Sequence, residues 1–150
     1  MSAKLPAADG RLWSVADCVF CAIAGGEAPA TIIDEDADTV AFMDINPRAR
    51  GHALVVPRRH YENLLEIEPE DLANTFAAAK RLVARMTDKL GADGVMLWNS
   101  SGEAAGQVVM HFHVHVIPVK GETMPTPNRP DRKIEESDIA TAAAALRGEG

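Results

Sequence analysis

The segment His111-Phe-His-Val-His-Val-Ile-Pro118 places three histidines at alternate positions with apolar residues between them. Successive side chains of a β-strand point to opposite faces, so the three histidines are expected to share one face of a strand. Phe112, Val114 and Val116 are then expected to pack on the other face. Neighbouring histidines on one face lie roughly 6.5–7 Å apart at Cα, which is close enough to surround a small anion. The chain holds only five histidines, so this alternation indicates a functional cleft.

The rest of the pattern predicts an α+β domain with a mainly antiparallel sheet. Short apolar runs between turn residues predict five strands, over residues 31–34, 39–44, 52–56, 94–99 and 111–119. Asp17 is expected to cap a short helix that continues to Ile23. A long helix is expected to begin at Pro69 and to end at Gly91. Its core-facing stripe is expected to contain Leu72, Phe76, Ala79, Val83, Met86 and Leu90.

The length of 150 residues corresponds to about one domain. Residues 17–120 contain the predicted strands and the long helix and are expected to form that domain. Residues 1–16 are rich in Ala, Pro and Gly and predict a flexible arm. Residues 121–150 are expected to form a C-terminal extension, in which a proline-containing linker precedes a short helix over 139–146.

Composition and charge exclude several classes of protein. A hydrophobic fraction of 47% and a charged fraction of 25% are typical of a globular domain rather than a disordered chain. The net charge of −7 argues against a partner such as nucleic acid or an anionic membrane. The apolar runs are too short to span a bilayer, and residues 1–17 lack the apolar stretch of a secretory signal. We therefore expect the protein in the cytoplasm.

Cys18 and Cys21 form a single C-x-x-C motif and are the only cysteines. In a reducing compartment such a pair is more often a metal half-site or a redox centre than a structural disulfide. Both of these interpretations remain open from the residues alone. The remaining histidines, His52 and His60, and the carboxylate of Asp44 do not by themselves indicate a reaction.

The histidine pattern resembles the signature of the histidine-triad (HIT) family of nucleotide hydrolases and transferases. Three further segments carry the resemblance: Phe42-Met-Asp-Ile-Asn-Pro47, Gly51-His-Ala-Leu-Val-Val-Pro57 and Gly106-Gln107. The resemblance extends over about residues 17–118 and is greatest to the bacterial Hint-like branch. It implies a HIT-like fold and a homodimer. The branch that favours dinucleoside polyphosphates is less similar.

The resemblance also implies an activity and a set of site residues. It implies hydrolysis or nucleotidyl transfer on purine nucleoside phosphoramidates or related mononucleotide conjugates, through a nucleotidyl-histidine intermediate. His113 matches the nucleophile, and His115 and His52 match residues around the phosphate and the leaving group. The residues that match nucleotide-binding positions are Asp44 for the ribose, Asn99 and Gln107 beside the phosphate, and Phe20, Ile23, Phe42 and Ile45 around the purine base. Val108 stands where members of the family often carry a serine.

A structural zinc ion is the cofactor that the resemblance implies. Its ligands would be Cys18, Cys21, His60 and His111, which give the two thiolates and two imidazoles that tetrahedral zinc accepts.

Three other functions remain as alternatives. One is a dinucleoside polyphosphate hydrolase. A second is a hydrolase whose catalytic zinc is held by His111, His113 and His115. The third is a nucleotide-binding regulatory module without a physiological reaction.

Overall fold

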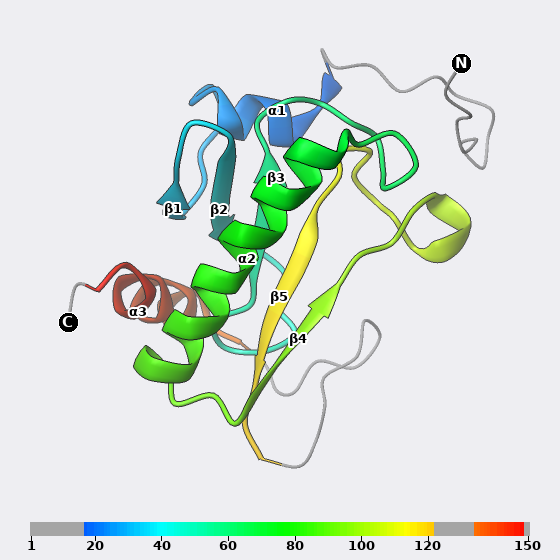
Figure 1. Ribbon diagram of the computed structural model, residues 1–150. Helices are drawn as coiled ribbons and strands as arrows, with labels where there is room; N and C mark the ends of the chain where they lie inside the picture. The colour runs from blue at the N-terminus through cyan, green and yellow to red at the C-terminus, as the bar shows by residue number, and fades with distance from the viewer. Residues whose placement is uncertain (1–16, 122–133, 149–150) are drawn as a thin grey trace.

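In a computed structural model that describes residues 17–121 and 134–148, five strands form one antiparallel sheet in the order β1-β2-β3-β5-β4 (Figure 1). The strands are β1 (Ile32–Glu35), β2 (Thr39–Met43), β3 (Ala53–Pro57), β4 (Gly94–Trp98) and β5 (Val114–Val119). The helices are α1 (Val19–Ala24), α2 (Pro69–Lys89) and α3 (Glu136–Arg147), with a short 3₁₀ helix η2 (Glu103–Ala105). The predicted α+β class and five-stranded antiparallel sheet are confirmed. The arm predicted over 1–16 lies outside the described residues.

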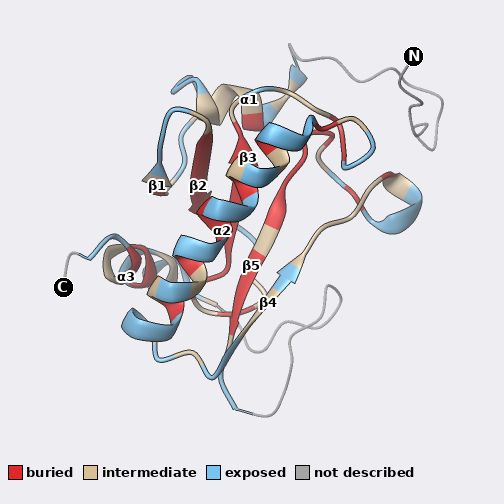
Figure 2. Cartoon of the chain, in the orientation of Figure 1, coloured by how far each residue is buried: buried red, intermediate tan, exposed pale blue. Residues whose placement is uncertain are grey.

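The two faces of the sheet carry separate apolar clusters. Helices α2 and α3 cover one face, where Val55, Leu82 and Phe112 belong to the larger core. The smaller cluster lies on the opposite face, where Phe42 and Leu54 pack with Phe20 of α1. Strands β2 and β3 are therefore buried on both sides, while the outer surface of α2 faces solvent (Figure 2).

Helix α2 begins with Pro69 in its first turn, as predicted, and acidic residues follow it there. The predicted stripe is wrong in one respect, because Phe76 is 40% exposed. The buried positions of the helix are Asp71, Thr75, Ala78, Ala79, Leu82 and Met86. The small side chains of Ala78 and Ala79 pack against the sheet and rotate Phe76 toward solvent. The Asp71 carboxylate tolerates burial because it accepts a hydrogen bond from Tyr61 Oη at 2.6 Å.

Two predicted boundaries are also wrong. The N-cap of α1 is Cys18 rather than Asp17, and the Cys18 thiol accepts a hydrogen bond from the Cys21 amide. The fifth strand begins at Val114 rather than His111. Its pairing with β3 begins at Val114, and the amide of Phe112 instead donates to the carbonyl of Tyr61 at 2.6 Å. Residues 111–113 thus leave the ladder and pair with a loop.

Helix α3 includes the short helix predicted over 139–146 and is longer at both ends. Ala142, Ala143 and Leu146 are buried in the larger core beside α2. Arg147 Nε donates to the carbonyl of Ile32 on β1 at 2.7 Å. Among the described residues, no helix combines the length and hydropathy that a bilayer crossing requires.

Candidate active site and metal centre

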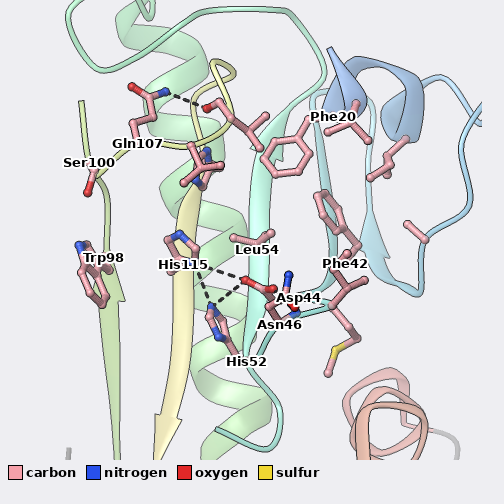
Figure 3. Close-up of a pocket in the computed structure, with 18 of the residues that line it drawn as sticks. Phe20, Phe42, Asp44, Asn46, His52, Leu54, Trp98, Ser100, Gln107 and His115 are labelled. Atoms are coloured by element: carbon pink, nitrogen blue, oxygen red, sulfur yellow. Dashed lines mark hydrogen bonds and ion pairs between the residues drawn. The ribbon is translucent and has the colours of Figure 1, made fainter. Parts of the chain in front are cut away.

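A cleft of about 770 Å³ opens on the face of the sheet that carries α1 (Figure 3). Part of its floor is a row of paired residues, in which Phe42 of β2 faces Leu54 of β3, Leu54 faces His115 of β5, and His115 faces Trp98 of β4. Directly paired residues point to the same face of a sheet. The row therefore crosses four strands beneath one cleft.

His113 lies in this cleft with one ring nitrogen fixed by the main chain. Its Nδ1 is 2.7 Å from the carbonyl oxygen of His111. A carbonyl oxygen can only accept, so Nδ1 carries the hydrogen and Nε2 keeps its lone pair. Burial lowers the pKa of His113, so the ring is neutral at neutral pH. His113 thus combines a neutral ring with a free nitrogen, as a nucleophile requires.

His52 and His115 form a hydrogen-bonded chain beside it. The amide of Arg48 donates to His52 Nδ1 at 2.9 Å, so His52 Nε2 carries the hydrogen and donates to His115 Nδ1 at 2.9 Å. The hydrogen of neutral His115 is therefore on Nε2. Burial lowers the pKa of His52 to about 4. Burial, together with the positive charges that His113 and His52 would carry, lowers the pKa of His115 to about 3.

Asp44 contacts the same pair of histidines. Its Oδ1 accepts from the Asn46 amide at 2.7 Å, and its Oδ2 lies 3.4 Å from His52 Nε2 and 3.8 Å from His115 Nδ1. These three side chains lie close enough to hold an ion. A metal on His52 Nε2 would, however, move the hydrogen of that ring to Nδ1, where it would face the donating amide of Arg48. The cluster is therefore better suited to hydrogen bonding than to metal binding.

The residues expected around the base lie at one end of the cleft. Phe20, Ile23, Phe42 and Ile45 all line it. The rings of Phe20 and Phe42 meet edge to face, with their centroids 5.3 Å apart. The centroid of the Phe20 ring also lies 5.2 Å from that of His113. Ile45 is 84% exposed at the mouth. These contacts join an apolar slot directly to the ring of His113.

Two of the residues expected beside the phosphate make main-chain contacts. Asn99 Nδ2 donates to the carbonyl of His113 at 2.9 Å, and Asn99 does not line the cleft. Gln107 lines the cleft, but its Nε2 donates to the carbonyls of Glu62 and Val109 while its Oε1 accepts from Gly102. Gln107 thus orders the loop before the histidines and has no side-chain hydrogen left to donate.

The four residues expected to bind zinc come together beside the cleft. Cys18, Cys21, His60 and His111 each offer a donor atom within 4.8 Å of the others. The distances from sulfur to Nδ1 are 3.4 Å for Cys18 and His111, 3.3 Å for Cys21 and His60, and 3.4 Å for Cys21 and His111. Tetrahedral zinc with ordinary bond lengths separates sulfur and nitrogen ligands by about 3.6 Å. The donor set therefore fits zinc.

The surroundings also prepare these atoms for a metal. His111 Nε2 donates to the carbonyl of Pro57 at 2.7 Å, which leaves the Nδ1 lone pair toward the cysteines. Burial raises the pKa of the Cys18 thiol, but the contacts of its sulfur with His111, His60 and the Cys21 amide outweigh burial and lower that pKa to about 5. Burial and the hydrogen bond with Cys18 raise the pKa of Cys21 to about 12. Cys18 therefore gives up its proton to a metal more readily than Cys21 does.

Because His111 joins the cysteines, the three histidines of the motif do not converge on one ion. His113 belongs to neither of the groups of possible metal ligands found among the described residues. This arrangement disfavours a catalytic zinc held by His111, His113 and His115.

Trp98, whose ring centroid lies 6.1 Å from that of His115, was not among the predicted site residues. An aromatic residue next to Asn99 was a visible signal, but its partner depends on the pairing of β4 with β5. The amide of Arg48, which orients His52, was not predicted either, because no sequence pattern indicates it.

A model of the HIT domain family matches residues 25–122. The chain belongs to the HIT family. It is 46% identical over 101 residues to an uncharacterized HIT-like protein of Methanocaldococcus jannaschii, with 67% of this chain and 78% of that protein covered. It is 35% identical over 105 residues to the adenosine 5′-monophosphoramidase hnt1 of Schizosaccharomyces pombe, with 70% of this chain and 76% of that protein covered. It is 38% identical over 104 residues to the adenylylsulfatase HINT3 of Arabidopsis thaliana, with 69% of this chain and 53% of that protein covered.

Solved structures of HIT proteins share the fold. A zinc-bound histidine triad family protein from Mycobacterium smegmatis superimposes with a TM-score of 0.76 and 35% sequence identity, covering 90% of this chain and 96% of the other. The resemblance inferred from the histidine pattern is thereby confirmed. The HIT family includes hydrolases, as the names of the two enzymes above state.

Proposed function

We propose that this protein hydrolyses purine nucleoside phosphoramidates, or related mononucleotide conjugates, through an intermediate in which the nucleotide is bound to His113. The observation that carries the proposal is the hydrogen bond from His113 Nδ1 to the carbonyl of His111, which leaves Nε2 unprotonated. The names of two relatives, an adenosine 5′-monophosphoramidase and an adenylylsulfatase, support adenylyl conjugates as the substrate class.

The reaction has two steps. In the first, the lone pair of His113 Nε2 forms a bond to the α-phosphorus, and the phosphorus–nitrogen bond to the leaving group breaks. The electron pair of that bond stays on the leaving amine, which takes one proton from solvent while the N–H of His115 donates a hydrogen bond to it. In the second step water adds to phosphorus, the bond to His113 breaks and one proton returns to solvent. The net change is the addition of one water molecule.

The surrounding residues hold the nucleotide. The base would lie in the slot of Phe20, Ile23, Phe42 and Ile45, and Asp44 would accept hydrogen bonds from the ribose hydroxyls. The chain of hydrogen bonds from Arg48 through His52 fixes the tautomer of His115, so that the N–H of Nε2 is available to the leaving group.

Zinc, when bound by Cys18, Cys21, His60 and His111, would supply a cross-link that stabilises the fold. It would tie α1, which carries Phe20, to the segment that leads into β5. Four protein ligands leave no open position for water, so this site is structural. A homodimer is also part of the proposal, with α2 and β4 as the contact surfaces. Phe76 and Leu97 are exposed apolar residues on those two elements.

The test is an intact-mass measurement after rapid quenching of the protein with adenosine 5′-phosphoramidate. The wild-type protein should gain one adenylyl group, and His113→Ala should gain none while it still binds AMP. Hydrolysis that persists in His113→Ala would refute the assigned nucleophile.

Two further measurements separate the alternatives. Turnover that stops with a chelator and forms no adduct would favour a catalytic zinc. A higher kcat/KM for a dinucleoside polyphosphate than for the phosphoramidate would favour the polyphosphate hydrolase, and tight AMP binding with slow turnover of every substrate would favour the regulatory module.

A further inference from the structure

The row of paired residues under the cleft extends one strand beyond His115. Strands in a sheet lie about 4.8 Å apart, so Trp98 on β4 lies three strands, or roughly 14 Å, from Phe42 on β2. His115 stands between them, with Trp98 as its direct partner on the side away from the base slot. Figure 3 shows the two aromatic side chains on opposite sides of His115. The cleft therefore has an aromatic group at each end.

A bound conjugate has to extend along this row. Its base occupies the slot at Phe20 and Phe42, and its phosphorus lies beside His113 and His115, whose ring centroids are 5.1 Å apart. The leaving group is attached to phosphorus on the side away from the nucleoside. It is therefore directed toward the far wall of the cleft, on the side of His115 where Trp98 and Ser100 lie (Figure 3).

The chemistry of that wall is apolar and aromatic. Among the described residues that line the cleft, the acidic and basic ones are Asp44 and Arg48. Both lie in the segment after β2, and neither lies on β4 or in the loop after it. The polar atoms of Gln107 are already bonded to the main chain. Val108 is 83% exposed, so a ligand that covers it removes apolar surface from water. On this side of the cleft, the described lining residues include no carboxylate that could pair with an ammonium group.

We propose that Trp98 and Val108 form a leaving-group subsite that selects conjugates of amines with an aromatic or large apolar substituent. This inference rests on the proposed function and specifies its substrate class. The indole of Trp98 gives a flat surface against which an aromatic ring packs. Val108, which lines the same cleft from the loop after η2, adds exposed apolar surface. A cationic amine would lose its hydration on this wall without gaining a partner.

The test compares kcat/KM for three phosphoramidates of AMP, whose leaving groups are benzylamine, 1,4-diaminobutane and ammonia. In the wild-type protein the benzylamine conjugate should be hydrolysed with a kcat/KM about tenfold above that of the diaminobutane conjugate. Trp98→Ala should remove most of this preference, and Trp98→Phe should restore a large part of it.

Leu97→Ala is the matched control. Leu97 is the neighbouring residue on β4, but it pairs with Val116 and faces the side of the sheet that α2 covers. Leu97 also lies on the proposed dimer surface, so the overall rate is free to change, but this variant should keep the wild-type ratio of the benzylamine and diaminobutane conjugates. A wild-type ratio near one, or a ratio that Trp98→Ala leaves unchanged, would overturn the subsite.

The two proposals fail in different ways. If the wild-type protein hydrolyses the conjugates through His113 but does not discriminate among them, the subsite is wrong and the proposed function stands. If no conjugate is hydrolysed, the proposed function is wrong. Calorimetric binding of the benzylamine conjugate to His113→Ala and to His113→Ala/Trp98→Ala then tests the subsite separately, and equal affinities would refute it.

Discussion

Replacing His115 by asparagine should make the free energy of unfolding less sensitive to acid. His115 and His52 are neutral in the folded protein because their pKa values are lowered to about 3 and about 4. In the unfolded chain a histidine has a pKa near 6.5. Below pH 6.5 the unfolded chain therefore binds protons that the folded protein does not, and stability falls as the pH falls toward the folded pKa values.

The size of the effect follows from these pKa values. Each of the two histidines removes about 1.4 kcal/mol of stability per pH unit below 6.5, which amounts to about 2.7 kcal/mol each at pH 4.5. Together they remove about 5 kcal/mol, a large share of the roughly 5–15 kcal/mol that stabilises a typical domain. Asparagine at position 115 does not titrate. The loss of unfolding free energy that comes from positions 52 and 115 should therefore be about half as large in the variant.

The assay is urea unfolding of the wild-type protein and His115→Asn at pH 7.5 and pH 4.5. The cysteines and histidines of the metal cluster are the same in both proteins, so the difference between the two acid losses reports on His115. An equal loss of stability in the two proteins would refute the reasoning, because it would mean that the folded protein accepts a proton on His115 at an ordinary pKa.

Elemental analysis should find one zinc per chain in the wild-type protein and none in the Cys18→Ser/Cys21→Ser variant. The thermal stability of this variant should fall more than the rate of its chemical step. A metal-free wild-type protein of full stability would contradict this prediction. Gly51→Ala should lower the free energy of unfolding by about 2 kcal/mol or more, because Gly51 has φ +95° and a Cβ there would lie 2.5 Å from Leu90 Cδ1 and 3.0 Å from Pro118 Cγ. Urea unfolding measures this, and unchanged stability would refute the steric argument. Sedimentation velocity at micromolar concentration should find a dimer, whereas a single species of 16.1 kDa would contradict the proposed homodimer.

The fold was largely predictable because its signals are local. Alternating apolar residues and turn residues indicated each strand, and Pro69 marked the start of the long helix. Periodicity locates a stripe on a helix but does not determine which small residues meet the sheet. Phe76 was for that reason expected inside, and the contacts of Ala78 and Ala79 with the core turn it outward.

The site was predictable as a set of residue types but not as a set of hydrogen bonds. The motif indicated that His113 and the C-x-x-C pair were important, and the structure brings the four expected zinc ligands together. The bond from His113 to its neighbour's carbonyl depends on residues 111–113 leaving the strand, which alternation does not reveal. The position of Trp98 depends on strand register, which is a long-range property.

The two edges of the sheet differ in a way that limits how copies of the chain can assemble. Strand β1 is four residues long, and its pairing with β2 shifts register between Ile32 and Asp34. The carbonyl of Ile32 already accepts a hydrogen bond from Arg147. Short, irregular edge strands resist the addition of another strand. Strand β4 at the other edge is regular over its pairing with β5. A sheet that can be extended at one edge joins one other copy about a two-fold axis and then has no edge left to extend. Arg147 belongs to α3, the helix that completes the larger core, so the same helix helps to close the β1 edge to another strand.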